Sequence, residues 1–172
     1  MARLGVWTLV LLLLAQAARG GEITVRMVTD GERGRFRFEP QLVWIQVGDR
    51  VRFVPDSHLH GTRTIPAMLP AGAAGWSSPV GEPHVVVFDQ PGIYAYKCPS
   101  HYSLGMVGLI VVGDPAVNFD EARRMRHPPK AQAVFARLFA AVACLMERGG
   151  EACPGALEVM GSPDFRKAQK RQ

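Results

Sequence analysis

The chain of 172 residues is 48% hydrophobic and 20% charged, a globular composition that excludes wholesale disorder. Its formal net charge of +5, without a run of lysines and arginines interleaved with aromatic residues, argues against a nucleic-acid-binding protein. Thirteen prolines and eighteen glycines predict many turns, as in proteins built of short strands.

Residues 1–20 have the pattern of an export signal peptide. Arg3 supplies the positive start, residues 6–14 are largely apolar, and Ala15 and Ala17 are small residues at the spacing of a cleavage site. The apolar run is about half of the roughly 20 residues that span a bilayer, so a transmembrane anchor is the weaker interpretation. We expect cleavage near residues 17–20 and a mature chain without stable membrane insertion, because no later stretch is long and apolar enough.

Short alternating or apolar segments separated by turns follow. Strands are expected at residues 22–28, 42–47, 50–54, 84–89, 93–98 and 105–113. Gly48 and Asp49 separate the second strand from the third, which predicts a hairpin turn there. Together these segments predict a mainly β fold, a β-sandwich, for residues 21–113.

Beyond the last expected strand, apolar residues recur at helical spacing. Residues 118–126 form a short helical segment, and the prolines at 128–129 end it and can open a longer helix, since proline is tolerated in a first turn. We expect residues 114–150 to be a C-terminal helical extension packed on the sandwich. Residues 151–172 are expected to be a loosely ordered tail.

Two of the three cysteines lie in this C-terminal part. Cys144 and Cys153 flank two glycines, and in an oxidising compartment they could form a disulfide that joins the tail to the longer helix. Two unpaired thiols are the alternative.

A loop between two expected strands contains a thiol, an imidazole and a thioether. These belong to Cys98, His101 and Met106, and His60 lies on an earlier loop rich in proline and glycine. Two histidines, one cysteine and a distant methionine are the ligand set of a type-1 (blue) copper electron-transfer site. Thiolate and thioether stabilise Cu(I), whereas imidazole suits both oxidation states, so little must rearrange when one electron moves. Methionine is a poor zinc ligand, which favours copper over zinc.

A set of motifs extends from about residue 22 to about residue 145. The motifs are Phe38-Glu39-Pro40, residues 48–55, His60-x-x-x-Thr64-Ile65, residues 68–72, residues 90–94, Lys97-Cys98-x-x-His101-Tyr102-x-x-Gly105-Met106 and residues 129–132. As a set they resemble the pseudoazurins, a branch of the cupredoxins. The resemblance implies a Greek-key β-sandwich with one type-1 copper ion. It also implies an electron carrier, not an enzyme, that shuttles single electrons in the bacterial periplasm.

The resemblance also implies the ligands of the copper ion. They are His60, Cys98, His101 and Met106. His58 is the nearest competitor for the first position, but the offset from His60 to Thr64 agrees with the family. His84 and His127 are expected to be surface residues.

The chain departs from the family beside its ligands. Pseudoazurins usually carry Asn after the first His and Thr after the Cys, and these side chains tie the two ligand loops together. Gly61 and Pro99 stand at these positions and cannot form that bond. Ser100 replaces a proline of the family, and we hypothesise that its N–H donates to the sulfur of Cys98.

The resemblance implies a monomer that meets redox partners by transient contact. Donors would be c-type cytochromes or a periplasmic dehydrogenase, and acceptors nitrite reductase, nitrous-oxide reductase or a peroxidase. Contact would use an apolar patch around His101, with candidates Phe36, Met68, Leu69, Pro70, Pro99 and Leu104. A basic rim could include Arg33, Arg35, Arg37, Arg63 and Lys97, although ordinary solvated surface is the alternative for these residues.

Two other classes of function are weaker. A periplasmic copper-binding chaperone or store would show Met and His clustered on exposed loops, whereas the seven methionines of this chain are scattered. A copper enzyme needs further pairs of histidines, and the chain has five histidines in total.

Overall fold

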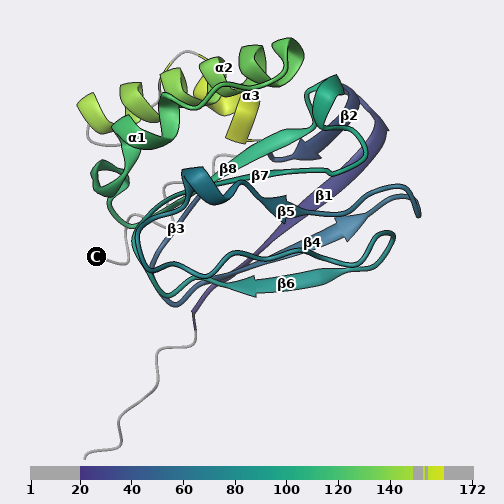
Figure 1. Cartoon of the computed structure of the whole chain (residues 1–172), viewed down its shortest axis with the longest axis horizontal. Helices are drawn as coiled ribbons and strands as arrows, with labels where there is room; N and C mark the ends of the chain where they lie inside the picture. Colours follow the sequence, from purple (N-terminus) through teal and green to yellow (C-terminus); the bar gives the residue numbers. More distant parts are fainter. Residues whose placement is uncertain (1–19, 149–152, 154, 161–172) are drawn as a thin grey trace, which may run out of the picture.

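Two four-stranded sheets face each other in the computed structural model, which describes residues 20–148, 153 and 155–160 (Figure 1). The first sheet has the order β2 (Gly34–Glu39), β1 (Glu22–Gly31), β4 (Arg50–Pro55) and β6 (His84–Val87). The second has the order β3 (Leu42–Ile45), β8 (Val107–Val112), β7 (Gly92–Lys97) and β5 (Arg63–Thr64). The predicted Greek-key β-sandwich is thus confirmed. All but the last residue of the expected signal peptide lies outside the described residues.

The hairpin predicted at Gly48 and Asp49 is wrong. β3 pairs with β8 in the second sheet, whereas β4 pairs with β1 and β6 in the first. The chain therefore crosses from one sheet to the other at this corner. The carboxylate of Asp49 stabilises the corner by accepting hydrogen bonds from the N–H groups of Gly21 and Gln46. Alternation along two adjacent strands is the same whether they pair with each other or diverge, so the sequence pattern did not distinguish the two cases.

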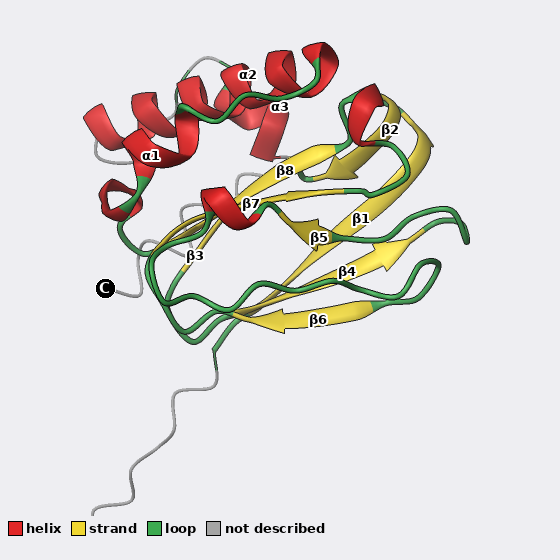
Figure 2. Ribbon diagram, in the orientation of Figure 1, coloured by secondary structure: helices red, strands yellow, loops and turns green. Residues whose placement is uncertain are grey.

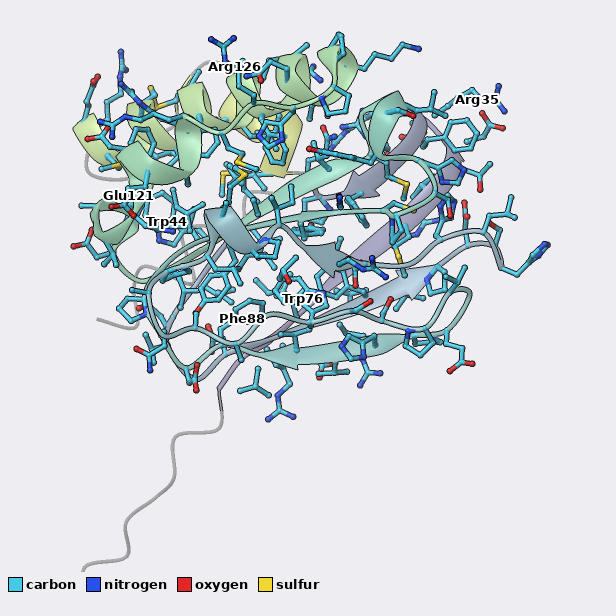
Figure 3. All side chains as sticks on the ribbon, in the orientation of Figure 1. Arg35, Trp44, Trp76, Phe88, Glu121 and Arg126 are labelled. Carbon is cyan, nitrogen blue, oxygen red and sulfur yellow. A yellow bond between two sulfur atoms is a disulfide. The ribbon has the colours of Figure 1, made fainter. Side chains whose placement is uncertain are left out.

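β7 and β8 are covered on both faces. Tyr94, Tyr96 and Ile110 belong to the core between the sheets, and Leu109 and Val111 to a second core beneath the helices. Every residue of β8 is buried as a result. Figure 3 shows Trp76 and Phe88 in the space between the two sheets. Double coverage explains why these two segments read as nearly continuous apolar runs rather than as alternating strands.

The expected helical extension lies over the second sheet (Figure 2). It contains α1 (Phe119–Arg123) and α2 (Pro129–Glu147), and α2 opens at the pair of prolines, as predicted, with Pro129 as its first residue. Phe135, Leu138 and Val142 of α2 are buried in the core beneath the helices. α2 is long and apolar enough to cross a membrane by length and composition, contrary to our expectation that no segment after residue 20 would be. Its buried face against β8 is that of a core helix.

Part of the expected tail is packed rather than loose. α3 (Ala156–Met160) follows Cys153, and the N–H of Gln41 donates to the carbonyl of Val159 (2.9 Å). A disulfide joins Cys144 of α2 to Cys153, which confirms the first of the two alternatives for these cysteines. The rest of the tail, and Gly149 and Gly150, lie outside the described residues.

Three short 3₁₀ helices complete the described elements. They are η1 (Pro66–Met68), η2 (Tyr102–Leu104) and η3 (Pro115–Val117). Asn118, between η3 and α1, is buried. Its side-chain amide hydrogen-bonds both the N–H and the carbonyl of Ile93. Its Oδ1 accepts from Ile93 N–H (2.7 Å), and its Nδ2 donates to Ile93 O (2.9 Å). One side chain thereby links the extension to the start of β7.

Replacing Asn118 by alanine should lower the free energy of unfolding by about 2–4 kcal/mol, because two buried backbone groups of Ile93 lose their partner. Urea denaturation of the Asn118→Ala protein measures this change. Val117→Ala, one residue away and exposed, is the matched control and should change stability by no more than about 0.5 kcal/mol. Equal effects of the two substitutions would contradict the assigned role.

Candidate metal centre

The loop between β7 and β8 carries three of the predicted ligands. Cys98 directly follows the last residue of β7, and Met106 directly precedes β8. The N–H of Cys98 donates to the carbonyl of Met106 (3.0 Å), and Met106 N–H donates to His101 O (3.2 Å). Gly105, with φ +92°, adopts the left-handed conformation that favours glycine. The sheet therefore fixes both ends of the loop, and internal hydrogen bonds fix its path.

His60 reaches the same place from the loop that follows β4. Its side chain is fully buried, and its carbonyl accepts a hydrogen bond from Gly81 N–H (2.7 Å). Potential ligand atoms of His60, Cys98 and His101 all lie within 4.8 Å of one another. Cys98 Sγ is 3.5 Å from His101 Nδ1. Among the described residues, these three form a candidate metal site.

The other candidates are placed differently. Met106 is fully buried beside Cys98 in the core between the sheets. His58 is exposed and lies outside the group, so the structure favours His60. His84 opens β6 and is partly exposed. His127 is also partly exposed, but its Nδ1 lies 2.7 Å from the hydroxyl of Tyr102, a contact that the sequence interpretation missed.

Two residues that the sequence interpretation missed hold His60 in place. Thr29 Oγ1 lies 2.9 Å from His60 Nε2, and Asp56 Oδ1 lies 3.4 Å from the same nitrogen. Asp56 in turn accepts hydrogen bonds from the backbone N–H and the hydroxyl of Thr29. With Nε2 engaged in this way, the other ring nitrogen, Nδ1, is the one available to a metal ion.

Burial favours the ligating form of both imidazoles. It lowers the pKa of His60, against the opposing effect of the Asp56 carboxylate, and it lowers the pKa of His101. Burial opposes ionisation of Asp56, but the hydrogen bonds from Thr29, the attraction to His60 and the hydrogen bond with Ser57 together lower the pKa of this carboxyl. Near neutral pH the site therefore presents neutral imidazoles, the form that binds metal ions.

The residues present fit a copper ion. His60 Nδ1 is buried without a hydrogen-bond partner among the described residues, and such a group is costly unless a ligand engages it. A thiol and two neutral imidazoles, with a buried thioether at the end of the same loop, form a mixture of soft and intermediate donors. This mixture suits copper better than zinc.

An aromatic ring covers the more exposed of the two histidines. Phe36 stacks on His101, with ring centroids 4.4 Å apart and planes 18° apart. Phe36 has φ +50°, the one positive value among the described non-glycine residues. This backbone conformation directs the Phe36 side chain, which belongs to the hairpin of β1 and β2, toward His101. Phe36 thus belongs to the surface around His101, as predicted.

Part of the predicted contact surface is wrong. Met68 and Pro70 are buried beneath the surface, whereas Pro99 and Leu104 are exposed on the ligand loop. The side chain of Arg37 is only 12% exposed, and it contacts Glu39 and Gln41 rather than solvent. Of the predicted basic residues, Arg33, Arg35, Arg63 and Lys97 remain at least partly accessible.

The hypothesis about Ser100 is not supported. Among the hydrogen bonds of the described residues, the sulfur of Cys98 has one polar neighbour, His101 Nδ1, and no bond from Ser100 N–H is present. Any effect of Ser100 on the site therefore needs a different cause.

Comparisons with known proteins agree with this geometry. The family model of copper-binding proteins of the plastocyanin/azurin family matches residues 25–113. A pseudoazurin of Methylorubrum extorquens is 38% identical over 125 residues, which covers 73% of this chain and 84% of the relative. A pseudoazurin of Paracoccus pantotrophus is 39% identical over 122 residues, covering 70% and 84%. The solved structure of pseudoazurin from Methylobacterium extorquens superimposes with a TM-score of 0.68 at 39% identity, covering 70% of this chain and 98% of that one.

Fold and site together define a blue copper protein of the cupredoxin class. Within that class, the chain belongs to the pseudoazurin family. It is accordingly an electron carrier rather than an enzyme, and copper is its cofactor. Family membership also sets aside the alternative of a copper chaperone or store.

Replacing Thr29 by valine should loosen His60, because Nε2 loses its nearest partner. In the metal-free protein we expect the single tautomer of His60 to give way to a mixture, which the ¹⁵N chemical shifts of the ring report. Copper affinity should fall by about 10-fold or more. Thr29→Ser keeps the hydroxyl and should restore both properties. An unchanged tautomer in the Thr29→Val protein would show that Thr29 does not position this ring.

Proposed function

We propose that this chain is a periplasmic type-1 copper protein whose single copper ion is held by four side chains. They are His60, Cys98, His101 and Met106. The observation that carries the proposal is the buried, unpartnered Nδ1 of His60 in one group with the thiol of Cys98 and the imidazole of His101. The position of Met106, fully buried at the end of the ligand loop, supports its role as the fourth ligand.

Bound copper supplies the reversible exchange of one electron between Cu(II) and Cu(I). The contribution of the protein is to keep the donors in place during that exchange. Cys98 and Met106 are anchored to strands, and Thr29 and Asp56 hold His60. His101 is the member of the group with accessible surface, because His60 and Cys98 are fully buried. We therefore assign the edge of His101 as the route by which electrons enter and leave.

The surface beside His101 suits brief contact with an acidic partner. Leu104 is 44% exposed and Pro99 is exposed on the ligand loop. Arg63 pairs across strands with Lys97, which directly precedes Cys98. Figure 3 shows Arg35 at the periphery of the molecule near the turn between β1 and β2. Apolar contact within a basic surround allows fast, electrostatically steered association and fast release.

We propose c-type cytochromes or a periplasmic dehydrogenase as donors. As acceptors we propose nitrite reductase, nitrous-oxide reductase or a peroxidase. Location in the periplasm is supported by the export pattern of residues 1–20 and by the disulfide between Cys144 and Cys153, which persists in an oxidising compartment. The protein should act as a monomer, since brief encounters need an accessible His101.

The mature protein loaded with Cu(II) should absorb strongly in the orange-red and give a reversible one-electron wave. Cys98→Ser should abolish the absorption, because the thiolate is its source. His60→Ala should greatly reduce it, whereas His58→Ala, a matched change two residues away at an exposed position, should leave it intact. A colourless wild-type protein, or equal loss in the two histidine variants, would contradict the proposed ligand set.

Electron transfer with an acidic c-type cytochrome should slow as ionic strength rises, because salt screens the basic surround. At low salt, Arg63→Gln should lower the second-order rate constant by about two- to fivefold. Arg148→Gln makes the same charge change at the far end of α2 and serves as the control. Stopped-flow spectroscopy measures both effects. A rate constant independent of salt would indicate that these residues are ordinary solvated surface.

A further inference from the structure

His127 of the helical extension contacts the ligand loop. Its side chain is half-buried, and its Nδ1 lies 2.7 Å from the hydroxyl oxygen of Tyr102. The His127 ring also packs on Phe135 of α2, with centroids 4.3 Å apart. Its backbone N–H donates to Oε1 of Gln132 (3.1 Å). The residue is thus held by α2 through both its ring and its backbone.

Tyr102 directly follows His101 and opens η2. On one side, Nζ of Lys97 lies 4.3 Å from the centre of the Tyr102 ring. On the other side, the hydroxyl of Tyr102 meets His127. One side chain of the ligand loop is therefore held between the sheet, through Lys97, and the helical extension, through His127.

The backbone of the loop touches α2 as well. A Cβ added at Gly105 would lie 3.3 Å from the carbonyl oxygen of Lys130 and 3.4 Å from Cγ2 of Val134. The loop thus packs directly on the first turns of α2. The two contacts with the extension lie at different points of the loop, one at Tyr102 and one immediately before Met106.

Two properties keep the His127 side chain in this position. It precedes Pro128, and a residue before proline is restricted to extended backbone conformations. Burial and the neighbouring charge of Lys97 lower the pKa of His127. The neutral ring can therefore accept the hydrogen bond of the Tyr102 hydroxyl at Nδ1.

We propose that His127 is a positioning residue of the metal centre, which holds the ligand loop against the helical extension through Tyr102. The extension then has a role in the site and is more than a cover for one sheet. This inference rests on the proposed function, because it assumes that residues 98–106 carry the copper ligands. Motion of this loop would move His101 and Met106 relative to Cys98, and ligand positions need support of this kind to stay fixed.

Hydrogen exchange in the metal-free mature protein tests the contact without depending on copper. The amides of Leu104 and Gly105 donate within the loop, to His101 O and Tyr102 O. In the His127→Ala protein they should exchange about fivefold faster, because the loop opens more often. Tyr102→Phe removes the same hydrogen bond from the other side and should have the same effect. The double variant should be no faster than either single one.

Two further variants separate positioning from general stability. His127→Asn can place an oxygen near the position of Nδ1, so it should recover most of the protection. Arg126→Ala is the matched control, since Arg126 is exposed and Figure 3 shows it on the outer side of the extension. In the copper-loaded protein, His127→Ala and Tyr102→Phe should shift the reduction potential in the same direction, and Arg126→Ala should not.

Unchanged exchange at Leu104 and Gly105 in both single variants would overturn the inference, even if His127→Ala lowered the melting temperature. Additive effects in the double variant would also overturn it, because they would show that His127 and Tyr102 act separately. Failure of the proposed function has a different signature, namely a wild-type protein that stays colourless with Cu(II). The two failures are therefore distinguishable.

Discussion

The metal centre depends on the coverage of β7 and β8 from both sides. The first sheet packs on one face of this hairpin, and α2 packs on the other. A pair of strands held between two close-packed cores cannot slide or twist without disturbing both of them. The loop that joins the strands therefore begins and ends at fixed points. Cys98 and Met106 occupy those points, and the backbone hydrogen bond between them continues the ladder by one step.

The packing beneath this loop explains why the residue opposite Tyr96, at position 108, is glycine. Tyr96 is fully buried two residues before Cys98, and it pairs across strands with Gly108. A Cβ at position 108 would lie 2.4 Å from Cζ of the tyrosine ring, so the ring requires glycine there. Phe38 and Phe53 contact the same ring from the first sheet. A large side chain thus joins the two sheets directly below the candidate ligands, at the expense of any side chain on Gly108.

Sequence patterns predicted the parts of this structure that depend on local spacing. The strands around Cys98 and Met106 and the long helix from Pro129 follow from residues close together in the chain. The grouping of His60 with Cys98 and His101 was implied by the resemblance to the pseudoazurins. Thr29 and Asp56 could not be found in this way. They are 27 residues apart and meet because β1 and β4 are parallel neighbours in the first sheet. The role of His127 was missed for a similar reason, because its hydrogen-bond partner Tyr102 is 25 residues away in the sequence.

Hydrogen bonds at neighbouring positions hold the His60 loop, although Gly61 and Pro99 stand beside the ligands. Neither Gly61 nor Pro99 has a polar side chain that could link the two ligand loops, yet hydrogen bonds still fix the loop of the first histidine. Thr62 N–H donates to Ser78 Oγ (2.8 Å), and Ser78 N–H donates to Thr62 O (2.8 Å). Trp76 Nε1–H donates to Thr62 Oγ1 (3.0 Å), and the Trp76 ring stacks on Phe53.

These ties connect the histidine loop to the long loop before β6 instead of to the cysteine loop. The cysteine loop is held separately, by α2 at Gly105 and by the extension at Tyr102. Each ligand loop therefore has its own support. The two loops are joined by the pairing of β5 with β7 and by the cores behind them, with no side-chain hydrogen bond between them among the described residues. Because support of this kind can come from several directions, the residues next to the ligands do not by themselves determine how rigid the centre is.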